Sequence, residues 1–137
     1  MSLLSFKEVK KRGGQVILHS QWLHPIIHNQ YLKKEYLNMG LGNIEPIPEG
    51  RISRQLKEIE IVDRVWCISS LVTKSYLDYN ISSDKLINSS LGVDFKLYNN
   101  LSQIRSESEF NILFVGNVNP EKGVHLLLEA LIKIKSR

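Results

Sequence analysis

Arg64-Val65-Trp66-Cys67-Ile68-Ser69-Ser70 is a short run with an apolar centre that ends in two serines. A run of this length and pattern is typical of a buried strand. The side chain of Ser69 or of Ser70 can accept a hydrogen bond from a free amide at the start of a following helix. Val72 and Tyr76 are spaced to point inward from that helix. The stretch therefore predicts a strand that leads directly into a helix.

The same order of strand and then helix occurs elsewhere along the chain. Apolar spacing, together with glycine and proline positions, predicts helices over about 6–12, 25–39 and 52–59. A last helix should start at Val124, with one apolar face made of Val124, Leu127, Leu128, Leu131 and Ile134. Short apolar runs predict further strands at 15–19, 85–88 and 110–116. Because parallel strands need a covering crossover, this alternation predicts the α/β class with a parallel sheet.

The composition is that of a globular chain without strong bias. The 137 residues suit one domain or two incomplete ones, and 18 Lys and Arg against 14 Asp and Glu give a net charge of +4. Aromatic and basic residues are not interleaved on any expected strand, so we expect no nucleic-acid partner. The single Cys67 cannot form an internal disulfide, and the N-terminus lacks the pattern of a secretory signal. These features predict a cytoplasmic protein.

Two places at the expected carboxyl ends of strands carry candidate residues, because ligands of parallel sheets bind where such ends meet the amino ends of helices. One is His19, and the other is the loop from Gly116 to Gly123. Gly116 lets the backbone approach a ligand and Lys122 supplies a positive charge, so together they could hold a diphosphate. The same residues also fit an ordinary turn with a solvated lysine, since no P-loop pattern is present.

Several segments between Glu60 and Ala130 form an ordered set, and the resemblance that they carry covers the chain from about Val16 to its end. They are Glu60-Ile61-Val62-Asp63-Arg64-Val65, Ile68-Ser69, Lys85-Leu86-Ile87, Leu91-Gly92-Val93-Asp94, Ile112-Leu113-Phe114-Val115-Gly116, Glu121-Lys122-Gly123-Val124 and Leu127-Leu128-Glu129-Ala130. As a set they resemble family-four glycosyltransferases of the GT-B type. The resemblance implies a retaining transferase that moves a sugar from a nucleotide diphosphate sugar to a glycan or lipid-linked acceptor, in a cleft between two Rossmann-like domains.

The resemblance also implies a division of the chain. Residues 1–98 match the latter part of the acceptor-side Rossmann-like domain, the polar stretch 99–109 matches the linker, and residues 110–137 match the first strand and helix of the donor-side domain. The family's glycine-rich loop and its paired glutamates would lie outside these residues. We therefore expect the chain alone to be inactive or nearly so, either as a fragment or truncated product of a longer enzyme or as a subunit completed by a partner chain.

The resemblance assigns roles to individual residues. Lys122 matches a lysine that contacts the donor diphosphate, and Gly116 matches the glycine that ends the first donor-domain strand. Relatives commonly have arginine where this chain has Asn117, so donor affinity or donor identity stays open there. His19 falls where many relatives place a histidine that faces the reacting sugar, and His24 aligns with the histidine of a subgroup. Either imidazole could donate to a sugar hydroxyl or shift a proton, or could merely cap a loop.

The remaining expectations concern partners. No spacing of histidine, cysteine or carboxylate residues predicts a metal site, and we expect no cofactor besides the donor substrate. A sheet cut from a larger domain leaves strand edges and helix faces uncovered, which favours self-association or partial disorder. The basic charge allows peripheral contact with the inner face of an anionic membrane. The alternative function is a noncatalytic phosphate-binding or protein-interaction module.

Overall fold

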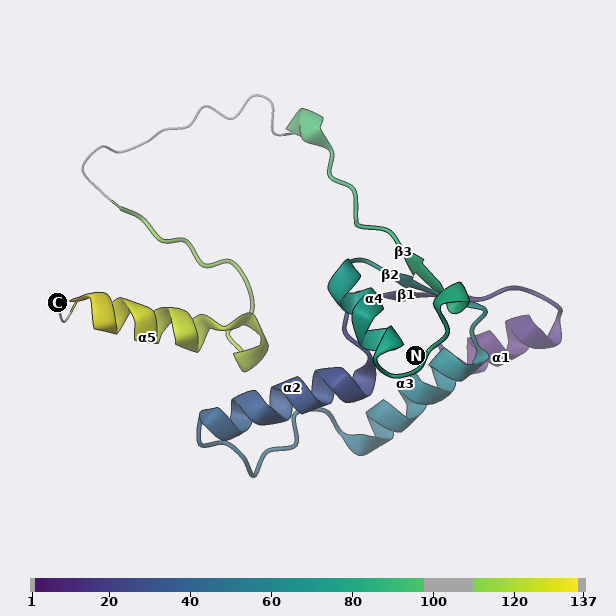
Figure 1. Ribbon diagram of the computed structural model, residues 1–137, viewed down its shortest axis with the longest axis horizontal. Helices are drawn as coiled ribbons and strands as arrows, with labels where there is room; N and C mark the ends of the chain where they lie inside the picture. Colours follow the sequence, from purple (N-terminus) through teal and green to yellow (C-terminus); the bar gives the residue numbers. More distant parts are fainter. Residues whose placement is uncertain (1, 98–109, 136–137) are drawn as a thin grey trace. The chain divides into compact units, whose positions relative to one another are not determined.

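The computed structural model describes residues 2–97 and 110–135 of a chain that divides into two compact units, Met1–Leu91 and Gly92–Arg137. In the first unit a parallel sheet has the strand order β1-β2-β3, formed by Ile17–Ser20, Arg64–Cys67 and Leu86–Asn88. Its helices are α1 (Leu3–Lys11), α2 (Pro25–Asn38), α3 (Glu49–Ile61) and α4 (Ser70–Leu77). Figure 1 shows these elements, and the predicted α/β class with a parallel sheet is confirmed. The linker expected at 99–109 lies outside the described residues.

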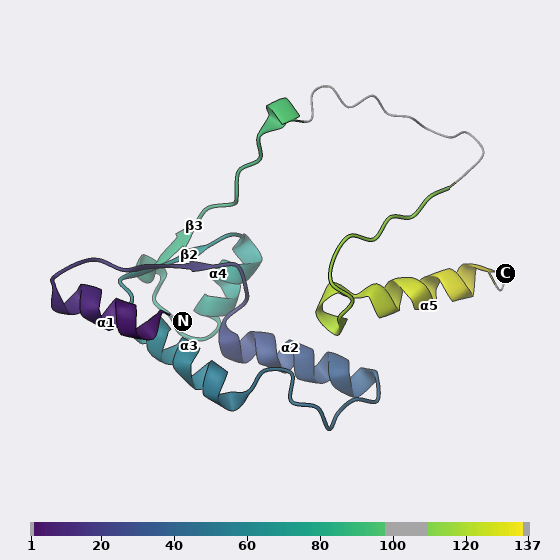
Figure 2. The same cartoon turned by 180° about the vertical axis from the view of Figure 1, so that it is seen from behind.

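Local sequence signals set the ends of the helices. Pro25 occupies the first turn of α2, where its missing amide has no partner to lose, and Gly40 follows the helix with a φ of 74°. At the start of α4, Ser69 is the capping serine: its hydroxyl accepts the amide of Val72 at 3.2 Å. Figures 1 and 2 both show α3 beside α1 and α2, so the two helices between β1 and β2 pack against each other.

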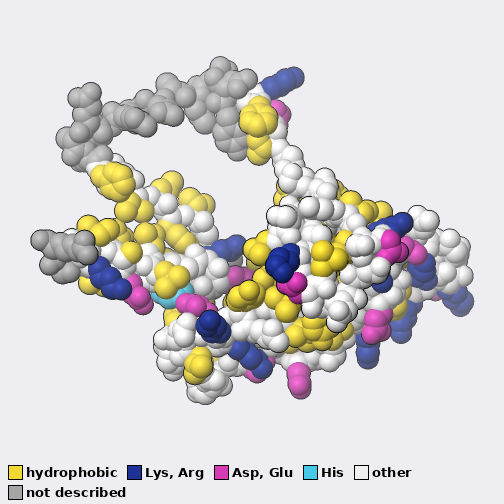
Figure 3. All heavy atoms as spheres, in the orientation of Figure 1, with side chains coloured by type: hydrophobic (Ala, Val, Ile, Leu, Met, Phe, Trp, Pro, Cys, Tyr) yellow, Lys and Arg dark blue, Asp and Glu magenta, His cyan; other side chains and the backbone are white. Residues whose placement is uncertain are grey.

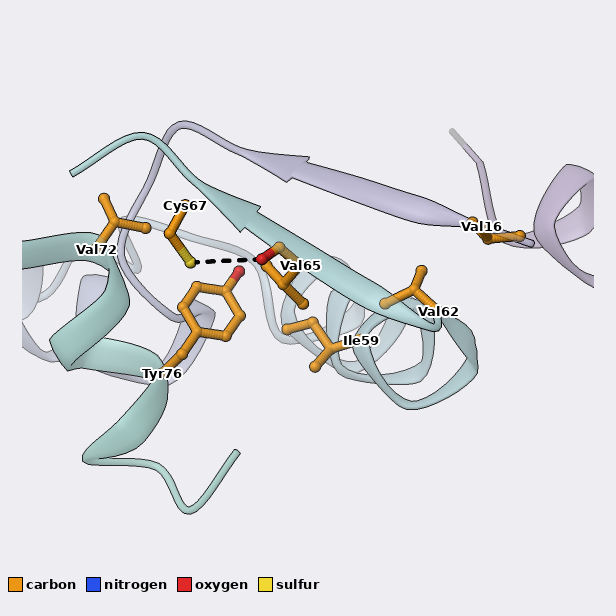
Figure 4. Close-up of a cluster of buried hydrophobic side chains, with 7 residues drawn as sticks. All are labelled: Val16, Ile59, Val62, Val65, Cys67, Val72 and Tyr76. Carbon is orange, nitrogen blue, oxygen red and sulfur yellow. Dashed lines mark hydrogen bonds between the residues drawn. The ribbon is translucent and has the colours of Figure 1, made fainter. Parts of the chain in front are cut away.

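The hydrophobic core lies on one face of the sheet. Val65 and Cys67 on β2 are completely buried, and they meet Ile59 from α3 and Tyr76 from α4 (Figure 4). The Cys67 thiol donates to the carbonyl of Val65 at a sulfur–oxygen distance of 3.9 Å, and burial raises its pKa. This cysteine is therefore a core residue and not an exposed nucleophile.

The opposite face of the sheet carries a row of larger side chains. His19, Trp66 and Ile87 are in register across β1, β2 and β3. They alternate with the buried residues along their strands, so they project from the face that the core leaves open. His19 and Ile87 are exposed, while Trp66 is half-buried.

Asp63 and Lys85 form hydrogen bonds near the amino ends of the strands and at the end of α3. The Asp63 carboxylate accepts the Val16 amide at 2.7 Å and the Lys10 ammonium at 2.6 Å. The hydrogen bond from Lys10 and that from Val16 lower the pKa of Asp63. Lys85, just before β3, donates to the carbonyl of Ile59 at 2.6 Å and so caps the last turn of α3.

The second unit contains α5 (Val124–Lys135), as predicted, but the strand expected at 110–116 is not formed. A strand requires a neighbour that pairs with its amides and carbonyls, and within the described residues the three strands of the sheet pair only with one another. Leu113 and Val115 are accordingly 85% and 84% exposed. Of α5, no residue is buried, and Figure 3 shows hydrophobic side chains gathered on this part of the surface.

No helix in the described part of the chain combines the length and the apolar character that crossing a membrane requires.

Candidate functional site

His19 lies on β1 as predicted, one residue before the strand ends at Ser20, whereas the sequence predicted it as the last residue of the strand. Its ring meets that of Trp66 on β2 at a centroid separation of 4.8 Å, with the two planes tilted by 44°. The Trp66 indole is itself held in place, since its Nε1 donates to the carbonyl of Ser89 at 2.9 Å. The pair forms a supported aromatic surface with an exposed imidazole at its edge, and such a surface can contact the apolar face of a flat or ring-shaped ligand.

A small hollow opens at this end of β1, with a cavity volume of about 100 Å³. It is lined by residues 18–20 of β1 together with Gln21, Trp22, Leu23, Pro25, Gln55, Glu58, Ile59 and Tyr76. Hydroxyl, amide and carboxylate groups are all present in this lining, so the hollow suits a polar group able to both donate and accept hydrogen bonds.

The hydroxyls of Ser20 and Tyr76 have a defined direction of hydrogen bonding. The Ser20 hydroxyl donates its one proton to the carbonyl of Trp22 at 2.9 Å. The Tyr76 phenol, 2.9 Å from the Ser20 oxygen, must then be the donor to it. Burial raises the pKa of Tyr76, so this phenol keeps its proton near neutral pH.

His24 occupies a different environment from His19. Its side chain is completely buried, stacked on Tyr79 at a centroid separation of 4.0 Å and edge-on to Tyr76 at 5.3 Å. Both ring nitrogens lack a hydrogen-bond partner among the described residues. Burial lowers the pKa of His24 to about 4, so the ring is neutral at pH 7. His24 does not line the hollow, and of the two candidate histidines only His19 does.

The backbone of His24 explains its burial. His24 precedes the first residue of α2, and its amide donates to the Ser75 hydroxyl of α4 at 2.9 Å. Ser75 in turn donates to the carbonyl of Val72 at 2.7 Å. The backbone of His24 therefore connects the start of α2 to α4. This structural role could not be predicted from the position of His24 in the sequence.

The second unit brings Gly116 and Lys122 together. A Cβ built on Gly116 would lie 3.7 Å from Cγ of Lys122, so the lysine stem passes beside the glycine backbone. Gly116 has a φ of 156°, and Gly123, which ends the short turn Pro120–Lys122, has a φ of 68°. Both backbone conformations favour glycine over residues with a side chain. The turn leads directly into α5, whose first amides lack intrahelical partners as in any helix.

Asn119 is the residue of this loop that the sequence analysis missed. Its side-chain oxygen accepts the Lys122 amide at 3.0 Å, which fixes the turn before α5. An asparagine followed by proline is a common signal for such a turn, so the pattern could have identified it. Asn117 is exposed, and its carbonyl accepts the Asn119 amide at 3.0 Å.

Trp66 and Glu58 are the other functional candidates that sequence reasoning did not single out. Trp66 could have been found by aligning the two strands from their carboxyl ends, because this places it next to His19. Glu58 lines the hollow from α3 and accepts the Ser2 amide at 3.2 Å. No local sequence pattern predicts that Glu58 lines the hollow, because its position there depends on how α3 packs against the rest of the first unit.

No group of three or more histidine, cysteine, aspartate or glutamate side chains comes together as a metal site in residues 2–97 or 110–135. Comparisons with protein-family models, curated proteins and solved structures found no match to this chain.

Proposed function

We propose that this chain is the central section of a retaining glycosyltransferase with two Rossmann-like domains, which takes a sugar from a nucleotide diphosphate sugar. The observation that carries the proposal is the turn in which Gly116 and Lys122 lie side by side at the entrance to α5. Backbone amides at the start of a helix and a nearby ammonium are both suited to phosphate oxygens. Asn117, an exposed amide in the same loop, adds a neutral donor where relatives of the resembled family carry a cation.

On the acceptor side, the proposal gives His19 the role of contacting the reacting sugar. The imidazole is exposed beside Trp66, and His19 is one of the residues that line the polar hollow. An aromatic face suits the apolar side of a sugar ring, while hydroxyl and carboxylate groups suit its hydroxyls. A glycan or lipid-linked acceptor offers both kinds of surface. His24, which is buried away from the hollow, has the structural role described above and no contact with substrate.

Calorimetric titration of the chain with ADP, GDP and UDP tests the donor site. We expect one of these nucleotides to bind, and Lys122→Ala to weaken that binding by about tenfold or more, because a charge-assisted contact to phosphate is lost. Lys135→Ala, at the far end of α5, removes the same charge and is the matched control. Equal losses in the two variants, or no binding of any nucleotide, would contradict the proposal.

A second candidate function is a noncatalytic phosphate-binding or interaction module built on the same loop. Residues 110–116 favour it, because most of them are exposed and none is in a strand, which leaves a segment able to pair with another protein. The two candidates differ in what the gene encodes downstream of codon 137. A continuing reading frame with two glutamates spaced by seven residues supports the transferase, whereas a stop codon at that point supports the module.

A further inference from the structure

A groove separate from both candidate sites runs between α2 and α3. Its cavity volume is about 510 Å³, which is the size of a site for a small molecule. The apolar part of its lining comes from Ile26 on α2 and from Ile52 and Leu56 on α3. None of its lining residues belongs to the hollow beside His19.

One residue that lines the groove has a buried acceptor that the described residues leave unsatisfied. The side chain of Asn29, on α2, is among the lining residues, and the residue is only 8% exposed. Its amide nitrogen donates to Glu45 at 3.4 Å, but its Oδ1 has no hydrogen-bond partner among the described residues. Leaving such an oxygen without a donor is unfavourable, because the group has lost its hydrogen bonds to water. A ligand that brings a donor to Oδ1 would recover this free energy.

The charges of the lining favour a positively charged ligand. Glu45 and Glu49 contribute two carboxylates, and Lys33 contributes one ammonium. Lys33 lies 3.0 Å from Glu45, and its hydrogen bond lowers the pKa of that carboxyl, so Glu45 stays ionised near neutral pH. With Glu45 paired, the second carboxylate, Glu49, leaves the groove with an excess of negative charge.

We propose that the groove between α2 and α3 binds a small primary amine with an apolar body. The ammonium donates to Asn29 Oδ1 and is attracted by Glu49, and the apolar body lies on Ile26, Ile52 and Leu56. This site goes beyond the proposed glycosyltransferase function, because it uses neither the loop from Gly116 to Gly123 nor His19. Its ligand class follows from the lining alone.

Three probes that share a cyclohexane ring and differ in their polar group separate the contributions of the hydrogen-bond donor and of the positive charge. Cyclohexylamine, cyclohexanol and cyclohexanecarboxylate are titrated into the full chain, and binding is followed by amide chemical shifts in two-dimensional NMR. We expect the amine to bind more tightly than the alcohol and at least about tenfold more tightly than the carboxylate, because only the amine supplies both the donor and the positive charge. Equal affinities for the three probes, or no binding of the amine, would overturn the site.

Substitutions of Glu49 and Asn29 test whether these two residues bind the amine. Glu49→Gln should weaken amine binding several-fold while leaving binding of the alcohol unchanged. Glu60→Gln removes a charge from an exposed position of the same helix and should leave both unchanged. Asn29→Leu should weaken binding of the amine and of the alcohol. If this variant does not fold, the comparison of Glu49→Gln with Glu60→Gln still tests whether the amine binds in the groove. Equal effects of the two glutamate changes would contradict the proposed role of Glu49.

Discussion

Burial separates the two candidate histidines at the scale of single residues. His19 is exposed on the open face of the sheet and lines the hollow, whereas His24 is completely buried between two tyrosines. A charged imidazole at the position of His24 would lie without a partner at the start of α2, where the helix dipole also disfavours positive charge. The folded protein therefore holds His24 in its neutral form.

The burial of His24 predicts an acid-sensitive fold. The pKa of His24 is about 4 in the folded protein against 6.5 for an unperturbed histidine, so the unfolded chain takes up the proton first as the pH falls. The neutral ring costs no stability above pH 6.5, and the free energy of unfolding falls between pH 6.5 and 4. The loss amounts to about 3 kcal/mol once the folded-state pKa is reached.

Urea denaturation followed by circular dichroism at pH 7.5 and at pH 4.5 measures this dependence. His24→Phe keeps a ring against Tyr79 and removes the titratable nitrogens, so its free energy of unfolding should change less between the two pH values than that of the wild type. His19→Phe makes the same change at an exposed position and should keep the wild-type dependence. A His24→Phe protein with the full wild-type acid sensitivity would show that other groups cause it.

At the scale of elements, hydrogen bonds to helix ends connect the sheet with its helices. Ser69 caps the start of α4, directly after β2, and Lys85 caps the end of α3 from the turn before β3. The Ser69 bond is local to the start of α4, whereas the Lys85 bond connects the end of α3 with the turn before β3, 26 residues further along the chain. Loss of either cap should weaken the fold without altering the hollow, whose lining contains neither residue.

The two neighbouring serines provide a matched pair for testing the cap of α4. Ser69→Ala removes the acceptor of the Val72 amide and should lower the free energy of unfolding by about 1 kcal/mol. Ser70→Ala changes an exposed residue inside the first turn and should have an effect within about 0.5 kcal/mol. Thermal or urea denaturation of the two variants measures the difference, and equal effects would show that Ser69 is not the capping residue in solution.

For the whole molecule, features that depend on neighbouring residues were predicted correctly from the sequence, whereas features that depend on distant residues were not. Helix α2, strand β2 and the helix after Ser69 follow from apolar spacing and from residues such as Pro25 and Gly40, which act over a few positions. The strand expected at 110–116 was wrong, because its existence depends on a distant partner strand. The place of His19 followed from the strand pattern, but the burial of His24 and the presence of Glu58 in the hollow depend on packing between helices.

The exposed apolar surface of the second unit predicts self-association of the whole chain. Leu128 and Ile132, one helical turn apart on α5, are 56% and 69% exposed. Sedimentation velocity should therefore show a mean mass that rises with protein concentration, since burial of such a surface in an assembly is favourable. Replacing both residues with serine should reduce the dependence, while Leu4→Ser, at an exposed position of α1, should not. A strictly monomeric wild type would contradict this expectation.

The binding of diphosphate by the loop from Gly116 to Gly123 is the central claim, and the backbone amides of the glycines report on it directly. A two-dimensional NMR titration of the chain with ADP, GDP and UDP follows the amide signals of all glycines at once. We predict that Gly116 and Gly123 shift in a saturable manner with the nucleotide that binds, while Gly13 and Gly40, in the first unit, stay in place. Unmoved Gly116 and Gly123 signals at saturating nucleotide, or shifts confined to other glycines, would contradict the claim.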